Sequence, residues 1–341
     1  MRMGEDLRLG LNLGYWQRHA DDATETVLAA ERLGYDSVWT AEAYGSDAFT
    51  PLAWYGARTS RIKLGTSVAQ ISARTPVATA MTAMTLDHLT GGRLLLGIGA
   101  SGPQVVEGWY GVPFPRPLAR TREYADIMRQ VWCREEPVTS AGPHYPLPHP
   151  GGTGLGKPLK LITHPLRADI PLYLGAEGPK NVALAAEIAH GWLPLFALPG
   201  EIERMYGDAL AGARPGFDIA AMVMVLITDD VRAALDGVKM MLTLYIGGMG
   251  AKSRNFHADI VARMGYADAA QKIQELYLAG RKDEAFHAIP DELADGISLV
   301  GPAGRIRERL QPWRDSPVTT LLAMGPRDEP TLRTVRDLVL G

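Results

Sequence analysis

The chain has 341 residues, of which 46% are hydrophobic and 21% are charged, as is ordinary for a globular protein with a sizeable core. Its 35 basic and 38 acidic residues give a net charge of −3, so neither nucleic acid nor an anionic membrane is an expected partner. Cys133 is the only cysteine, which excludes an internal disulfide and a cysteine-based metal site. The first residues do not form a secretory signal, and no apolar run reaches the ~18–20 residues that span a membrane. A cytoplasmic protein is expected.

Short β-rich runs alternate with helical patterns along the chain. Strands are predicted at 7–13, 36–40, 62–68, 93–98, 170–174, 191–195, 219–227 and 317–323. Helices are predicted over 21–33 and over 76–90, where Pro76 suits a first turn and Gly91 and Gly92 follow the last one. Several strands are almost continuously apolar, which is typical of parallel strands buried on both faces. This alternation predicts a (β/α)8 TIM barrel, with an open doubly wound sheet as the alternative.

Two segments are longer than a barrel needs, and one domain over residues 1–341 is expected to carry both as insertions. Residues 135–169 are dense in Pro, Gly and His, and residues 229–300 have the pattern of additional helices. We expect both insertions at the C-terminal face of the barrel, where active sites are built. Long loops there are typically lids or substrate walls, although an interface role is equally compatible with 229–300. The histidines of the first segment lack ligand-like spacing, so no metal site is expected.

Gly97, Gly99 and Gly102 form a G-x-G-x-x-G pattern at the end of the predicted strand 93–98. A dinucleotide-binding turn would open a helix directly and would have an acidic residue ~20 positions further on, at the end of the next strand. Here Pro103 follows the third glycine, and the acidic residues at that distance lie within a helical pattern. NAD binding is therefore not expected. We interpret the missing Cβ atoms of Gly97 and Gly99 as room for a flat ring to approach the backbone.

Four segments together resemble a known family: "LGYDSVWTAEAYGSDAF" (33–49), "GTSVAQISARTPVATAMTAMTLDHLTGGR" (65–93), "LTGGRLLLGIGASGPQVVEGWYG" (89–111) and "YLGAEGPKNVALAAEIAHGWLP" (173–194). They are similar to the bacterial luciferase-like family and, within it, to the oxidoreductases that depend on the deazaflavin coenzyme F420. That branch includes methylenetetrahydromethanopterin reductase and F420-dependent glucose-6-phosphate dehydrogenase. The motifs are specific as an ordered set, and the similarity covers essentially the whole chain. The resemblance implies a (β/α)8 barrel, a ring bound in its C-terminal mouth, and a homodimer.

The segment that closes the second predicted strand contains Glu42 and Ala43. Members of the family often carry an acid near the cofactor and a histidine near the reacting carbon at these positions. The missing imidazole argues against the sugar-phosphate dehydrogenase mechanism and removes the obvious proton-transfer residue. Glu42 is therefore the candidate catalytic residue and a candidate contact to the cofactor, the alternative being a solvated carboxylate. Ala43 is expected to line the substrate pocket.

The resemblance also suggests which residues hold the ring. It implies a non-prolyl cis peptide between Ser67 and Val68 that supports the ring from behind, and Gln70 is expected to hydrogen-bond the pyrimidine side. At the end of the first strand, Tyr15 and Trp16 would line the substrate side, with structural packing as the alternative. The ring and ribityl side are expected to contact Gly99, Ala100, Ser101 and Gln104.

The segment after the fifth predicted strand is expected to bind a phosphate. It consists of Gly175, Ala176, Glu177, Gly178, Pro179 and Lys180. The N–H groups of Ala176 to Gly178 and the positive end of the following helix would receive the anion, and Lys180 would add a charge. F420 carries a phosphodiester, so this chemistry fits, while a plain strand-to-helix turn is the alternative.

The resemblance implies an F420-dependent oxidoreductase that moves a hydride between C5 of the deazaflavin and a small organic substrate. An FMN-dependent monooxygenase of the same family is the first alternative, because the ring-binding segments suit both cofactors. A non-catalytic protein that binds a flavin or a deazaflavin is the second, because Ala43 stands where a histidine is common.

Overall fold

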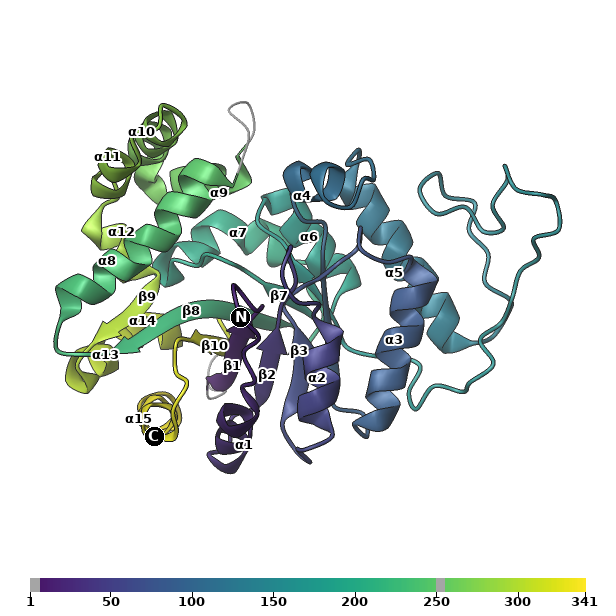
Figure 1. Ribbon diagram of the computed structural model, residues 1–341, viewed down its shortest axis with the longest axis horizontal. Helices are drawn as coiled ribbons and strands as arrows, with labels where there is room; N and C mark the ends of the chain where they lie inside the picture. Colours follow the sequence, from purple (N-terminus) through teal and green to yellow (C-terminus); the bar gives the residue numbers. More distant parts are fainter. Residues whose placement is uncertain (1–6, 250–254) are drawn as a thin grey trace.

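The computed structural model describes residues 7–249 and 255–341. Eight parallel strands close into a barrel, in which β10 pairs with both β1 and β8 (Figure 1). The barrel strands are β1 (Arg8–Gly14), β2 (Ser37–Thr40), β3 (Lys63–Thr66), β5 (Leu94–Gly99), β6 (Leu172–Gly175), β7 (Gly191–Leu193), β8 (Asp218–Ile227) and β10 (Thr320–Met324). Each of them overlaps one of the eight predicted strands, so the predicted (β/α)8 barrel is confirmed.

Two further strands were not predicted. The two-residue strand β4 (Ala69–Gln70) pairs with the end of β5, and β9 (Ser298–Gly301) pairs with the C-terminal part of β8. β8 is ten residues long, and only its first part pairs with β10 inside the barrel. Its second part therefore extends beyond the barrel and forms the base on which β9 and the neighbouring helices rest (Figure 1).

Helices surround the barrel. They are α1 (Thr24–Arg32), α2 (Phe49–Gly56), α3 (Pro76–Leu89), α4 (Pro103–Gly108), α5 (Pro117–Cys133), α6 (Pro179–Ile188), α7 (Ile202–Leu210), α13 (Ala303–Arg309), α14 (Gln311–Asp315) and α15 (Glu329–Leu340), with a 3-10 turn η1 (Pro199–Glu201) before α7. The prediction for α3 is confirmed at its start, where Thr75 accepts a hydrogen bond from the N–H of Ala78 and Pro76 occupies the first turn. Within the described ranges, no helix combines the length and apolar character that crossing a membrane requires.

The barrel interior is filled by side chains and is not a channel. Trp39 and Tyr173 meet edge to face with ring centroids 5.3 Å apart, and both are buried. The other buried members of this inner cluster are Leu95, Leu193, Ala220 and Leu322. A larger apolar layer lies between the strands and the surrounding helices. The strands have near-continuous apolar sequences because both of their faces are covered. Polar groups lie at the strand ends.

Residues 135–169 form an irregular segment that extends beyond α3 and α5 at one end of the molecule (Figure 1). The segment begins after α5 and leads into β6, so the expectation that it follows the carboxyl end of a strand is wrong. It is anchored to helices: Glu123 of α5 accepts the N–H of Tyr145, and Arg167 Nη2 lies 2.7 Å from Asp87 Oδ1 of α3. Connections from helix to strand belong to the opposite face of a barrel from the active site.

Residues 229–300 begin after the carboxyl end of β8, as expected. They form α8 (Val231–Leu242), the π-helical turn η2 (Thr243–Gly248), α9 (Phe256–Val261), a second π-helical turn η3 (Ala262–Tyr266), α10 (Ala267–Leu278), α11 (Lys282–His287) and α12 (Asp291–Gly296). These helices share an apolar cluster of their own, which includes Phe196 from the segment that follows β7. The insertion therefore packs against the C-terminal face of the barrel.

Candidate functional site

Glu42 follows β2 and is deeply buried, with 3% of its side chain exposed. Its Oε1 accepts the backbone N–H of Gln70 at 2.7 Å and lies 2.6 Å from Nη1 of Arg74, while Oε2 accepts the N–H of Ala48 at 3.1 Å. Although burial alone would lower the pKa of Arg74, its hydrogen bond with Glu42 and the charge of that carboxylate raise it above the ordinary value. Glu42 is thus not a solvated carboxylate, because both of its oxygens are held by donors.

Gln70 lies on β4 and is 4% exposed. Its Nε2 donates to the carbonyl oxygens of Glu42 at 3.1 Å and of Ala43 at 3.3 Å, which fixes the orientation of the amide. Its Oε1 is buried and has no hydrogen-bond partner in the described part of the chain. Leaving a buried acceptor unpaired costs about 1–3 kcal/mol, so a ligand that donates a hydrogen bond here would be favoured.

The peptide between Ser67 and Val68 is cis, as the resemblance implies. Asn12 of β1, which no sequence motif singled out, donates from Nδ2 to Ser67 Oγ at 3.1 Å. The Cγ2 atom of Val68 lies 2.6 Å from the place where a Cβ of Gly99 would stand, and Cγ1 lies 3.0 Å from that of Gly175. These two glycines therefore make room for Val68, which corrects our interpretation of the bare backbone at Gly99 as room for a flat ring.

The residues that follow β5 lie beside Gln70, because Gln70 pairs with Gly99 between β4 and β5. Ala100 is partly buried and Ser101 is exposed, with a φ of 59° that is uncommon for a residue other than glycine. Gln104 belongs to the short helix α4. The structure therefore brings Gly99 and the residues that follow it to the same strand ends as Glu42 and Gln70.

The turn between β6 and α6 is open on one side. Gly178 is the N-cap of α6, with φ −83° and ψ 149°, and no atom lies within 4 Å of the place where its Cβ would stand. Trp192 Nε1 donates to the carbonyl oxygen of Ala176 at 2.7 Å, and the hydroxyl of Tyr206 donates to that of Glu177 at 2.8 Å. These two hydrogen bonds fix the turn. Pro179 occupies the first helical turn, and Lys180 is exposed. This arrangement is compatible with an anion at the helix start.

The residues expected on the substrate side come from the loops after β1 and β2. The ring of Tyr15 lies 2.9 Å from the place of a Gly45 Cβ, so these two loops are in contact, and Trp16 is 37% exposed. The hydroxyl of Tyr110 donates to the carbonyl oxygen of Ala43 at 3.3 Å. Burial raises the pKa of both Tyr15 and Tyr110 above the ordinary value.

A cluster of rings from the 229–300 insertion and from the segment after β7 lies against the same strand ends. The ring of Tyr245, on η2, is 5.3 Å from that of Phe196 and 4.9 Å from that of His257 on α9. Burial, followed by interactions that include Tyr15 and Glu177, raises the pKa of Tyr245 to about 12. The sequence analysis missed Tyr245 and His257 because they belong to a helical segment without a recognisable motif.

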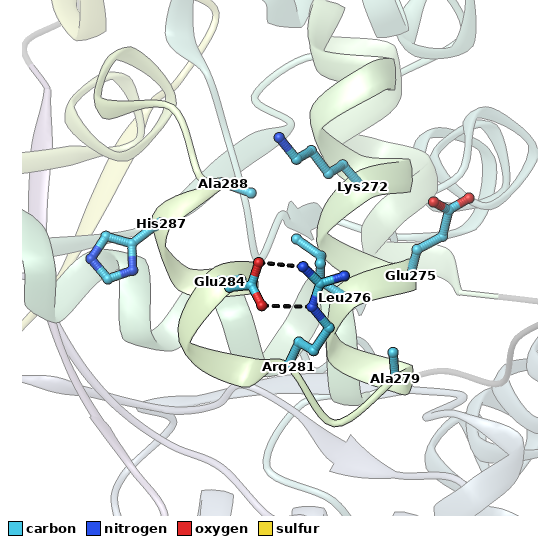
Figure 2. A pocket seen from close by; sticks show the side chains of 8 residues that line it. All are labelled: Lys272, Glu275, Leu276, Ala279, Arg281, Glu284, His287 and Ala288. Atoms are coloured by element: carbon cyan, nitrogen blue, oxygen red, sulfur yellow. Dashed lines mark hydrogen bonds and ion pairs between the residues drawn. The ribbon is translucent and has the colours of Figure 1, made fainter.

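A surface groove of about 780 Å³ lies elsewhere, between α10 and α11 at the outer edge of the insertion (Figures 1 and 2). Its lining residues are Lys272, Glu275, Leu276, Ala279, Arg281, Glu284, His287 and Ala288. Figure 2 shows Arg281 and Glu284 paired with each other inside it. None of the candidate site residues lines this groove, so we do not place the site there.

Comparison with known sequences agrees with the resemblance described above. The family model described as Luciferase-like monooxygenase matches residues 8–320. A Mycobacterium tuberculosis protein named "Putative coenzyme F420-dependent oxidoreductase" is 57% identical over 98% of this chain and 99% of its own length. The 5,10-methylenetetrahydromethanopterin reductase of Methanolobus tindarius is 26% identical over 92% of this chain and 93% of its own length.

Comparison with solved structures gives the same fold. The coenzyme F420-dependent tetrahydromethanopterin reductase of Methanopyrus kandleri aligns with a TM-score of 0.77 and 22% identity, over 98% of this chain and 99% of that one. An F420-dependent secondary alcohol dehydrogenase, solved with an F420–acetone adduct, aligns with a TM-score of 0.78 and 16% identity over the same shares. At these identities the likeness shows a shared fold.

Proposed function

The chain belongs to the luciferase-like monooxygenase family, and from this premise we propose that it is an oxidoreductase that uses coenzyme F420 to move a hydride to or from a small organic substrate. The name of the relative that is 57% identical supports the cofactor. The structural observation that carries the proposal is the buried Oε1 of Gln70, which has no hydrogen-bond partner among the described residues. When bound, F420 supplies a deazaflavin ring that carries a hydride at C5.

The residues around Gln70 fit such a ring. Its pyrimidine portion carries an N–H group, which can donate to Gln70 Oε1 and so satisfy that acceptor. Gln70 cannot turn freely, because its Nε2 is held by the carbonyl oxygens of Glu42 and Ala43. In this proposal Gln70 binds the ring, the Ser67–Val68 segment lies behind it, and Glu42 holds Gln70 and Arg74 in position.

The turn at 175–180 fits the phosphodiester of the same cofactor. Gly178 leaves the backbone accessible at the start of α6, where the positive end of the helix favours an anion. Lys180 is exposed close by and adds a positive charge. We therefore assign the cofactor's side chain to this turn and the ring to the ends of β3, β4 and β5.

Titration with oxidised F420 and, separately, with FMN tests the proposal. We expect F420 to bind more tightly than FMN, and Gln70→Met to weaken F420 binding at least tenfold, which is ~1.4 kcal/mol. Gln311→Met on the exposed surface of α14 is the matched control and leaves binding unchanged. Micromolar FMN binding without F420 binding would favour the monooxygenase alternative. Binding of F420 without turnover of any substrate would favour a non-catalytic carrier.

A homodimer is the second part of the proposal. The 135–169 segment exposes several large apolar side chains, of which Ile162 is 90% exposed and Leu155 is 86% exposed. Leu159 and Leu166 of the same segment are 68% and 53% exposed. Such a concentration of apolar surface is typical of protein–protein contacts, which supports an interface role for this segment.

A further inference from the structure

His257 lies on α9 of the insertion, within the cluster of rings described above. Its ring packs edge-on against Tyr245 and Phe196, with centroids 4.9 Å and 6.0 Å away. Its side chain is 16% exposed, and the backbone N–H of His257 donates to Oδ1 of Asn255, which caps α9. The rings therefore restrict the imidazole on one side, and the helix cap fixes the backbone that carries it.

A carboxylate lies on the other side of this imidazole. Nδ1 of His257 is 3.1 Å from Oε1 of Glu177, although the angle is not that of a hydrogen bond. A carboxylate at one ring nitrogen orients an imidazole and stabilises a positive charge on it, which leaves the other nitrogen to exchange a proton. Within the described ranges, Nε2 of His257 makes no hydrogen bond to another residue.

The groups that face His257 come from several elements. Glu177 follows β6 and Tyr245 belongs to η2, and Tyr15 and Tyr44, from the loops after β1 and β2, act electrostatically on Tyr245. Thus an imidazole–carboxylate pair and a set of aromatic rings meet at the C-terminal mouth of the barrel, beside the turn assigned to the cofactor's side chain. Ala43, which follows β2, stands where members of the family often carry a histidine, and an alanine cannot transfer a proton. Another residue must therefore give the proton to the substrate.

We propose that His257 is the acid–base residue of the site, and that its Nε2 gives a proton to the oxygen of a planar, uncharged carbonyl substrate. This inference rests on the proposed F420-dependent function. The aromatic rings of Phe196 and Tyr245 favour a flat substrate. The apolar surroundings of these rings disfavour a charged one.

The carbonyl carbon takes a hydride from reduced F420, and the π electrons of the C=O bond move to the oxygen. That oxygen takes the Nε2 proton of His257, which completes the alcohol. The neutral imidazole regains a proton from water. Two electrons have then passed from the reduced cofactor to the carbonyl group, and the second proton of the reduced cofactor is released to water, so the reaction balances.

The test uses the full chain, reduced F420, and benzaldehyde as a planar, uncharged carbonyl probe. Turnover is followed by the absorbance of oxidised F420, and the dissociation constant of F420 is measured for each variant. His257→Gln is the main variant, and Tyr245→Phe asks whether the phenol gives the proton instead. His287→Gln is the control, because His287 belongs to the same insertion on α11 and is 64% exposed.

We expect His257→Gln to lower kcat about 10²–10⁴-fold, the range for loss of an acid–base residue, while F420 affinity changes less than threefold. The wild-type protein should lose activity at high pH, and His257→Gln should lose that dependence. Wild-type kcat and pH profile in His257→Gln, or a loss in Tyr245→Phe alone, would overturn the inference. F420 binding without benzaldehyde reduction by the wild-type protein would overturn it too, whereas failure to bind F420 would overturn the proposed function itself.

Discussion

Nη1 of Arg74 lies 2.6 Å from Oε1 of Glu42, and this buried ion pair joins the loop after β2 to the segment after β4. Backbone N–H groups of Gln70 and Ala48 donate to the same carboxylate. Both oxygens of this carboxylate are therefore occupied by donors that belong to the protein. The geometry therefore favours a positioning role for Glu42 over the proton-transfer role expected from the sequence.

Replacing Glu42 by Gln distinguishes these two roles. Arg74 would lose its charged partner. Because Arg74 is 23% exposed, we expect the free energy of unfolding to fall by about 2 kcal/mol, which is less than the ~3–5 kcal/mol typical of a fully buried pair. F420 binding should weaken, since Oε1 of Glu42 accepts the backbone N–H of Gln70 and so positions that residue, while kcat at saturating F420 should fall less than tenfold. Denaturant unfolding, F420 titration and steady-state kinetics measure the three quantities.

Asp47→Asn is the control for this change. Asp47 Oδ1 lies 3.9 Å from Nη2 of Arg74 and is 39% exposed, so removing its charge should leave all three quantities near the wild-type values. If Glu42→Gln instead lowered kcat about 10²–10⁴-fold and left stability and affinity unchanged, Glu42 would be an acid–base residue after all.

Gly178→Val tests the assignment of the phosphodiester to the turn before α6. The backbone of Gly178 is extended and precedes a proline, which valine tolerates, and no protein atom lies within 4 Å of the new Cβ. The variant should therefore fold normally. A ligand close to this backbone would collide with the valine, and we expect F420 binding to weaken at least tenfold in a calorimetric titration.

Gly212→Val, in the turn after α7, is the matched control because a Cβ there also meets no atom within 4 Å. It should bind F420 with the affinity of the wild-type protein. An unchanged dissociation constant in well-folded Gly178→Val would show that the phosphodiester binds elsewhere.

The strands could be predicted from the sequence because their cause is local. A run of apolar residues buried on both faces predicts a parallel strand, and this was sufficient for all eight strands of the barrel. The resemblance located the cis peptide at Ser67–Val68 and the candidate residues Glu42 and Gln70. It did not reveal how Glu42 is paired, because Arg74 reaches it only through tertiary packing.

Other features depend on contacts between distant segments and could not be predicted in the same way. Nothing in the sequence indicated that Val68 would fill the space beside Gly99, so the glycine was assigned to the ring instead. The sequence predicts the 135–169 segment at the C-terminal face, but this prediction is wrong. The segment follows α5 and leads into β6, and such connections lie at the opposite face of a barrel. His257 approaches Glu177 only because the insertion folds back over the barrel.

Ile162→Glu tests the interface proposed for the 135–169 segment. Ile162 is 90% exposed, so a glutamate there should not disturb the fold of a monomer. It would place a charge in an apolar contact, and we expect the dimer to dissociate at least tenfold more readily in light scattering coupled to size exclusion. Leu278→Glu on α10, where the leucine is 47% exposed, should leave the dimer unchanged. A wild-type protein that is monomeric, or a variant that remains fully dimeric, contradicts this interface.

His190 makes the stability of the barrel depend on pH. Its Nδ1 accepts the N–H of Leu172 at 3.1 Å, a bond that requires this nitrogen to be unprotonated. Burial is the largest cause that lowers the pKa of His190 below its ordinary value of 6.5, and Arg214 adds to this effect while Asp169 opposes it. The unfolded chain therefore binds a proton at this residue more readily than the folded chain does.

The free energy of unfolding should consequently be independent of His190 well above pH 6.5 and should fall as the pH decreases below this value, by at most ~1.4 kcal/mol per pH unit for one proton. His190→Gln keeps an acceptor for the Leu172 N–H but cannot take up a proton. Urea unfolding at pH 7.5 and pH 5.5 should therefore show a smaller loss of stability in His190→Gln than in the wild-type protein. His149→Gln, in the 135–169 segment, should retain the wild-type loss. An equal loss in His190→Gln would mean that other groups carry the pH dependence.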